Sequence, residues 1–218
     1  MERLPTGIEG LDHLLEGGIP KGFSVMLNGP IGSYRDLLAL EFLYRGAMQG
    51  ESALYITLEK KEEDVKEMAS VFDWKMDELM KTKNFVVVTS ELFNFEQFVS
   101  NIDDALFTYK STRLVFDSAA FLADFFEREL QLRQGLLELK TVLDRHGTTG
   151  LFLDNVDQND TPESVMDGAI ETRLVEVKGQ MVHALAVRDM RSTETSSIQH
   201  PIELSHTGLK VHKFPLVV

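Results

Sequence analysis

The sequence has no cysteine, and this absence excludes disulfide bonds, thiolate metal sites and cysteine nucleophiles. Basic residues are also scarce: 22 lysines and arginines stand against 35 aspartates and glutamates, which gives a formal net charge of -13. Proteins that bind nucleic acid non-specifically need cationic side chains to displace the counterions of the phosphate backbone. We therefore expect no nucleic-acid partner unless a local basic patch is present.

Long apolar runs are absent as well. No stretch approaches the roughly 20 consecutive apolar residues that span a bilayer, and residues 1–5 lack the apolar core of a signal peptide. We expect a soluble, cytoplasmic protein without a membrane segment. The six histidines show no metal-site spacing such as H-E-x-x-H, so they predict no metal site.

The apolar residues that are present suffice for one α/β domain covering residues 1–218, since 43% of the 218 residues are hydrophobic. Apolar runs and helical spacing predict strands at 23–28, 53–58, 85–89, 114–117 and 150–154, and helices at 36–48, 60–69, 74–80, 95–109 and 122–145. Further predictions are a polar surface loop at 155–162, a hairpin of 169–177 with 181–188, and two short strands within 201–211. The alternation predicts a mostly parallel central sheet flanked by helices, with an antiparallel C-terminal extension.

The turn after the first of these strands lies where a phosphate-binding loop belongs. The pattern G-x-x-x-x-G-K-[ST] binds phosphate through its backbone amides, its lysine and its hydroxyl group. In this chain Gly29 occupies the first glycine position, whereas Tyr34, Arg35 and Asp36 replace the second glycine, the lysine and the hydroxyl residue. Taken alone, the stretch is most economically an ordinary strand-to-helix turn capped by Asp36.

Motifs along nearly the whole chain follow a known order. They open with T-G-I-x-G-L-D-x-L-L-x-G-G-I-P-x-G at residues 6–22 and continue with A-L-Y-I-T-L-E at 53–59, W-K-M-D-E-L at 74–79, R-L-V-F-D-S at 113–118, M-R at 190–191 and H-P-I-E-L at 200–204. In this order the sequence resembles the KaiC-like ATPases of the RecA superfamily. The resemblance implies a RecA-like P-loop NTPase fold.

The resemblance places a degenerate phosphate-binding loop at Gly29, Gly32, Ser33, Tyr34, Arg35 and Asp36. In the family the loop lysine reaches the outer phosphates and the hydroxyl residue binds Mg²⁺. Tyr34 adds bulk where the backbone should approach an anion, and Arg35 replaces a compact ammonium by a wide planar fork. Asp36 brings a like charge to the phosphate, which costs about 4 kcal/mol at a distance of about 4 Å and an effective dielectric of about 20.

Two further positions depart from the family and one agrees with it. The paired glutamates that typically prepare the attacking water read Glu59-Lys60, which leaves Glu59 as one possible base. The family's Lys-Met-Arg motif, which contributes positive charge to the nucleotide of a neighbouring subunit, reads Asp189-Met190-Arg191 in this chain. An acid replaces the lysine, and Arg191 is the basic residue of the motif that is retained. Asp117 with its following serine matches the metal-organising Asp-Ser and would hold Mg²⁺ if nucleotide binds. Taken alone, Glu59 is a surface acid and Arg191 a surface ion-pair partner.

Because the loop, the paired acids and the inter-subunit lysine all depart together, the sequence favours an inactivated ATPase without a cofactor. Such a protein would act as a regulatory or scaffold protein, through a protein partner such as an active paralogue, or through self-association. One alternative is an atypical ATPase in which Arg35, Asp36, Glu59 and Asp117 handle Mg-ATP and Arg191 acts between subunits. A second is a DNA-binding ATPase of the recombination type, which the acidic balance opposes.

Overall fold

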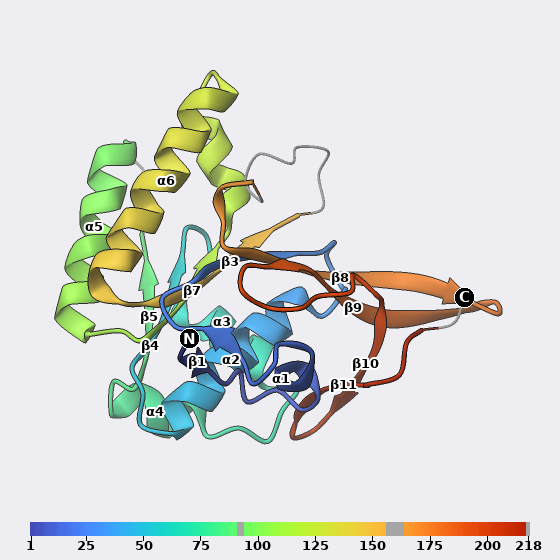
Figure 1. The fold of residues 1–218 in the computed structure, drawn as a ribbon. Coiled ribbons are helices and arrows are strands. Elements are labelled where there is room, and N and C mark those ends of the chain that lie inside the picture. Colours follow the sequence, from blue (N-terminus) through green and yellow to red (C-terminus); the bar gives the residue numbers. More distant parts are fainter. Residues whose placement is uncertain (91–93, 156–163, 217–218) are drawn as a thin grey trace.

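The centre of the protein is a nine-stranded sheet with the strand order β11-β10-β9-β8-β3-β7-β6-β4-β5. The computed structural model describes residues 1–90, 94–155 and 164–216 (Figure 1). Its strands are β3 (Ser24–Asn28), β4 (Ala53–Thr57), β5 (Phe85–Thr89), β6 (Arg113–Asp117), β7 (Thr149–Asp154), β8 (Gly168–Val177), β9 (Gln180–Met190), β10 (His200–Ser205) and β11 (Gly208–Val211). Strands β8, β3, β7, β6, β4 and β5 run parallel, and β9, β10 and β11 extend the sheet antiparallel. The predicted α/β class and antiparallel extension are confirmed.

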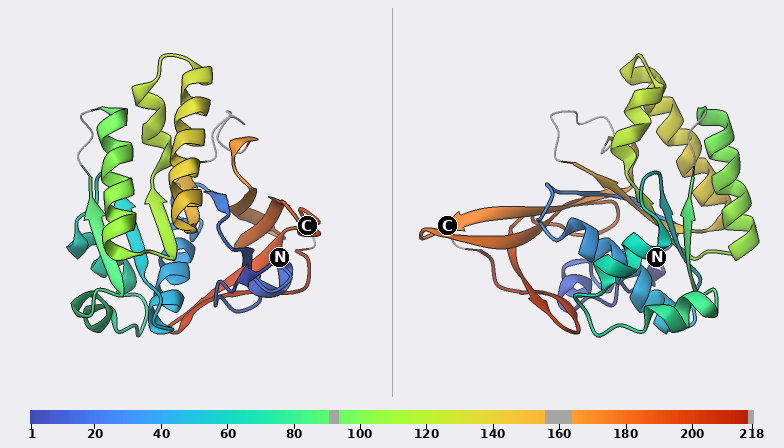
Figure 2. Two further views of the ribbon diagram at one scale, coloured as in Figure 1. Left: turned by 60° about the vertical axis from the view of Figure 1, so that its left-hand side comes forward. Right: turned by 180° about the vertical axis from the view of Figure 1, so that it is seen from behind.

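Helices cover both faces of the parallel part, which explains why its central strands are apolar along their length. The helices are α1 (Leu11–Leu14), α2 (Arg35–Met48), α3 (Glu62–Ala69), α4 (Met76–Lys81), α5 (Phe95–Tyr109) and α6 (Glu129–His146), with a 3-10 helix η1 (Ala119–Phe125). One core cluster lies between the sheet and α1 to α4, and the other lies under α5, α6 and η1. Figure 2 shows these two layers from two further sides. Among the described residues, no helix combines the length and apolarity needed to cross a membrane.

Most predicted elements lie within three residues of the observed ones, but the single helix predicted at 122–145 is wrong. The chain leaves the helical conformation after Phe125 and starts α6 from Arg128, whose φ of -130° and ψ of 139° are extended. Phe125 and Phe126 pack edge-on against Phe95 of α5, with ring centroids 6.3 and 5.0 Å apart, and this contact holds the chain at the break. The strands β1 (Arg3–Leu4) and β2 (Ile19–Pro20) were missed, because two residues are too short to show periodicity. Of the predicted loop at 155–162, only Asn155 belongs to the described residues.

The register of the parallel strands brings most of the predicted site residues to one edge of the sheet. Asn28 lies beside Asp154 and Glu171, so the loop that follows β3 begins at the carboxyl end of β7. Thr57 lies beside Asp117, so Glu59 and Asp117 belong to the same edge. In an open parallel sheet, ligands bind outside the carboxyl ends of the strands.

Candidate functional site

The loop between β3 and α2 ends in a left-handed residue. Tyr34 is the N-cap of α2, with a φ of 69° and a ψ of 10°, a conformation that glycine adopts at no steric cost. Tyr34 occupies the N-cap position, and among the described residues no side-chain capping hydrogen bond is made there, so the predicted Asp36 cap is wrong. The carboxylate of Asp36 instead accepts hydrogen bonds of 3.0 Å from Nε and 2.8 Å from Nη2 of its neighbour Arg35.

Arg35, which replaces the phosphate-binding lysine, points back into the loop. Its side chain is buried, with the residue only 6% exposed. Besides the pair with Asp36, its Nη1 donates to the carbonyl oxygens of Gly29 at 3.0 Å and Asp154 at 2.8 Å, and to Oδ1 of Asn155 at 2.9 Å. The guanidinium is therefore bound to four acceptors of the protein itself, at the place where the family binds phosphate.

The inner side of the loop is filled by two hydroxyl groups. Ser33 is fully buried, and its Oγ lies 2.7 Å from Oγ1 of Thr172 on β8 and donates to the carbonyl of Pro30 at 2.7 Å. A Cβ added to Gly29 would lie 2.1 Å from the same Thr172 hydroxyl. Only glycine therefore allows the loop to pack this tightly against β8.

Tyr34 turns its ring away from the loop and onto strand β9. The rings of Tyr34 and His183 are stacked with centroids 3.6 Å apart and planes 13° from parallel. Nδ1 of His183 is buried and has no hydrogen-bond partner among the described residues, and burial lowers the pKa of this histidine below its ordinary value. The bulk that replaces glycine thus links the loop to the antiparallel part of the sheet.

Asp117, the acid that the resemblance assigns to Mg²⁺, is also engaged within the chain. Its Oδ2 accepts a hydrogen bond of 2.6 Å from the Tyr55 hydroxyl, and it forms an ion pair with the Lys60 ammonium. Asp117 is buried, and Lys60 is the residue that stands in place of the second glutamate. Burial, followed by the nearby Asp117 charge, raises the pKa of Tyr55 well above its ordinary value, so the phenol stays protonated and donates.

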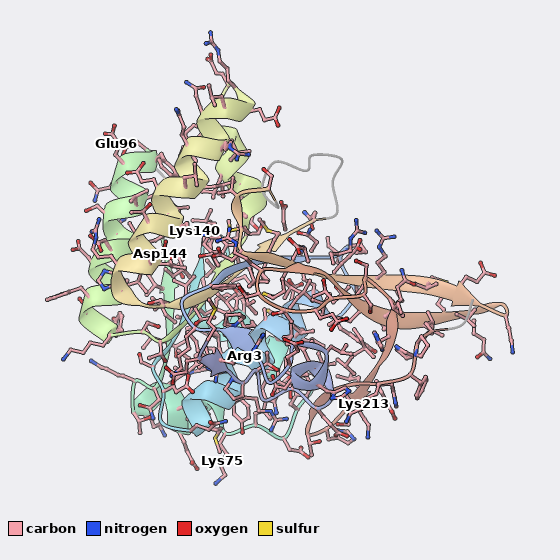
Figure 3. All side chains as sticks on the ribbon, viewed as in Figure 1. Arg3, Lys75, Glu96, Lys140, Asp144 and Lys213 are labelled. Atoms are coloured by element: carbon pink, nitrogen blue, oxygen red, sulfur yellow. The ribbon has the colours of Figure 1, made fainter. Side chains whose placement is uncertain are left out.

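Glu59 lies at the same edge but is exposed, as expected for a surface acid. Arg191 lies at the other end of the strands, since its neighbour Met190 pairs with Gly168 at the level of Val25. It forms an ion pair of 2.8 Å with Asp167, and its side chain is 63% exposed. Figure 3 shows Lys140 and Asp144 on α6 at this amino-terminal edge, where Lys140 also pairs with Asp167. Within one chain, Arg191 is therefore not part of the loop site.

The residues present do not fit a magnesium–triphosphate group. A cation of the chain lies in the phosphate position, and another is paired with the carboxylate that would hold the metal. Among the residues that the structure describes, no group of three or more metal-ligating side chains is placed to hold an ion. Sequence reasoning identified the altered loop residues but missed their partners Asn155, Thr172 and His183, because no motif or local spacing marks contacts between such distant segments.

Comparisons with known proteins agree with the fold. The family model of the KaiC ATPase matches residues 4–215. A crystal structure of a KaiC-like protein from Pyrococcus horikoshii OT3 is 30% identical and covers 97% of this chain and 99% of its own, with a TM-score of 0.87. Relatives described as UPF0273 proteins include one from Thermotoga maritima and one from Saccharolobus solfataricus, each 29% identical over 97% of this chain, which spans 96% and 83% of their lengths.

Proposed function

Starting from the fact that the chain belongs to the KaiC family of ATPases, we propose that it is an inactivated member with a regulatory or scaffold role. In this proposal it neither binds nor hydrolyses ATP. It works by contact with protein partners, among them an active paralogue or further copies of itself.

The observation that carries the proposal is the position of Arg35. A triphosphate would have to displace its guanidinium from the loop, which would leave the Gly29 carbonyl without its donor and remove one of the donors to the Asp154 carbonyl. Each buried polar group that loses its partner costs about 1–3 kcal/mol. A nucleotide bound with a Kd of about 1 mM gains only about 4 kcal/mol in total. The loss of the internal contacts would therefore offset a large part of the affinity of such a millimolar site.

The pair of Lys60 with Asp117 supports the same conclusion at the metal position. A Mg²⁺ ion organised by this carboxylate would lie close to the ammonium, and the two cations would repel each other. Glu59 is at the correct edge of the sheet, but without metal and phosphate it has no water to activate for attack. The atypical ATPase that uses Arg35, Asp36, Glu59 and Asp117 would require both internal ion pairs to open.

Equilibrium binding of Mg-ATP and Mg-ADP to the pure protein, measured by calorimetry, tests the proposal. We expect no saturable binding at nucleotide concentrations up to about 1 mM. The matched control carries Tyr34→Gly, Arg35→Lys and Asp36→Thr together, which restores the loop pattern. A gain of binding in this variant would show that the three side chains block the loop.

Two outcomes would overturn the proposal: binding by the unaltered protein with a sub-millimolar Kd, or ATP turnover that Glu59→Gln abolishes. Light scattering at several concentrations gives the mass in the same samples. A mass that rises with concentration would support self-association as the mode of action. A constant monomer mass would leave a different protein as the partner.

A further inference from the structure

Strands β8 and β9 continue well beyond the rest of the sheet. Pairing between β3 and β8 ends at Glu171, and β10 pairs with β9 only at Ala184 and Leu185. Within the described part of the chain, residues 173–183, here called the arm, therefore pair only with each other and, at their base, with Ala184. Figures 1 and 2 show the arm projecting away from the helical layers. A two-stranded ribbon is only marginally stable by itself, and its free edges are ready to pair with another strand.

The arm carries apolar side chains on both of its faces. One face is the face on which Thr172 contacts the loop between β3 and α2. This face bears Leu174 and Met181, which are 39% and 60% exposed. The opposite face, on the side of α6, bears the half-buried Val175, Val177 and Val182. A ribbon in contact with water on one side normally alternates apolar and polar residues. Apolar residues on both faces indicate that the arm is covered by a partner.

The face on the side of α6 is also basic, in a chain whose net charge is -13. Arg173 and Arg188 share the buried carboxylate of Glu171, so one positive charge is left over among the residues that the structure describes. Their side chains are 43% and 48% exposed, while that of Glu171 is 7% exposed. Lys178 lies in the turn at the far end of the arm. The three valines thus lie between cations at the base and at the tip.

The loop between β3 and α2 holds the base of the arm through two contacts. Tyr34 is stacked on His183, and Ser33 is hydrogen-bonded to Thr172. Tyr34 replaces the second glycine of the family pattern, and Ser33 is the buried residue that precedes it. A surface that is fixed before binding loses less conformational freedom when a partner docks.

We propose that the arm is the docking site for an acidic, extended segment of a partner protein. The segment adds as a strand along the free edge of β8. Its apolar residues cover Val175 and Val177, and its acids meet Arg173 and Arg188. Main-chain hydrogen bonds give such strand additions their affinity, and the alternate side chains give them specificity. This inference rests on the proposed function, because it names the kind of protein partner that the proposed scaffold binds.

A selection from random displayed peptides tests the proposal. Peptides of about ten residues are long enough, since they span about 33 Å when extended. We expect the enriched peptides to be acidic and to shift the backbone amide signals of the arm in NMR spectra. Arg173→Gln and Val175→Asp should each weaken their binding about tenfold, which corresponds to about 1.4 kcal/mol. Glu176→Gln, an exposed change on the opposite face, is the matched control and should leave the affinity within about twofold.

Four results would overturn the inference: no enrichment, enrichment of basic peptides, shifts outside the arm, or unchanged affinity of the two arm variants when their circular dichroism shows them folded. Concentration-dependent self-association that the same variants abolish would also overturn it, because the occupant would then be a second copy. The readout is independent of the nucleotide test. ATP binding by the unaltered protein would remove the proposed function without altering the peptide result.

Discussion

Nη1 of Arg35 donates a hydrogen bond of 2.8 Å to the main-chain carbonyl of Asp154, so a helix N-terminus and the end of a neighbouring strand are joined by one side chain. The two residues are 119 positions apart in the chain. In the family pattern the corresponding lysine binds phosphate. In this protein the cation has become part of the structure of the loop.

Arg35→Ala should therefore lower stability rather than activity. The change leaves the Gly29 carbonyl without its donor, removes one of the donors to the Asp154 carbonyl, and leaves the Asp36 carboxylate without its counter-ion. We expect the free energy of unfolding, measured by urea titration, to fall by about 2–4 kcal/mol.

Arg145→Ala is the control for this change. Arg145 forms an ion pair of similar length, 2.9 Å, with Asp103, but its side chain is 60% exposed. Exposed pairs contribute little, so its loss should cost less than about 1 kcal/mol. Equal losses in the two variants would show that the Arg35 contacts are as weak as a surface pair.

Much of the fold could be predicted from the sequence because buried strands and amphipathic helices have different apolar periods. Residues 85–89 and 95–109 were predicted as the strand and helix that are observed. The break before α6 could not be predicted, since residues 119–132 contain neither glycine nor proline and apolar residues continue on both sides of it. The contact with Phe95 that holds the chain there comes from a distant helix.

The position of the candidate site could be predicted from the sequence, but the contacts of its side chains could not. Family resemblance located the altered loop and the substitution at Lys60. The direction of the Arg35 side chain depends on acceptors supplied by β7, and the stacking of Tyr34 depends on a histidine of β9. Neither partner follows from spacing along the chain, because both are brought to the loop by the sheet register.

Lys60→Glu restores the paired acids and should create a weak site for divalent cations. The variant places a second carboxylate beside Asp117 and removes its counter-ion, so the two like charges repel each other. We expect a loss of about 1–3 kcal/mol in the free energy of unfolding. Millimolar Mg²⁺ should recover part of this loss, since a ligand at about ten times its Kd stabilises the folded state by about 1.4 kcal/mol.

The unaltered protein and the exposed-site variant Lys81→Glu provide the comparison. Neither should gain stability from Mg²⁺ beyond the small effect of ionic strength. A magnesium-dependent stabilisation of the unaltered protein would show that Asp117 is available to a metal despite Lys60.

His183→Phe should change how stability depends on pH. Burial lowers the pKa of His183 in the folded protein below the ordinary value of 6.5, so the unfolded chain binds the proton more tightly. The stabilising contribution of the neutral histidine is therefore present above pH 6.5 and is lost as the pH falls through the lowered pKa. Phenylalanine keeps a ring for Tyr34 to stack on and cannot be protonated.

Urea titrations of the two proteins over this range measure the difference. The unaltered protein should lose stability relative to His183→Phe as the pH is lowered below 6.5. Parallel curves would show that His183 has the same pKa in the folded and unfolded states.

Gly46→Ala tests the close packing between α2 and a buried arginine. Arg113 is fully buried and donates to the carbonyls of Phe42 and Pro5 and to the carboxylate of Glu51. A Cβ at position 46 would lie 2.3 Å from its Nε. Alanine is favoured over glycine in a helix interior by about 1 kcal/mol, but the arginine cannot move without leaving these acceptors. We expect a net loss of about 2–4 kcal/mol in the free energy of unfolding.

The double variant Gly46→Ala, Arg113→Met separates this clash from other effects of the methyl group. Arg113→Met alone should cost about 3–5 kcal/mol, because it leaves Glu51 without its counter-ion. Once the guanidinium is gone, the added methyl group meets a flexible thioether chain, so the second change should cost less than about 1 kcal/mol. The two changes would then couple strongly in a double-mutant cycle. Strict additivity would mean that the methyl group is accommodated without displacing Arg113, and the close packing would not be what requires glycine at position 46.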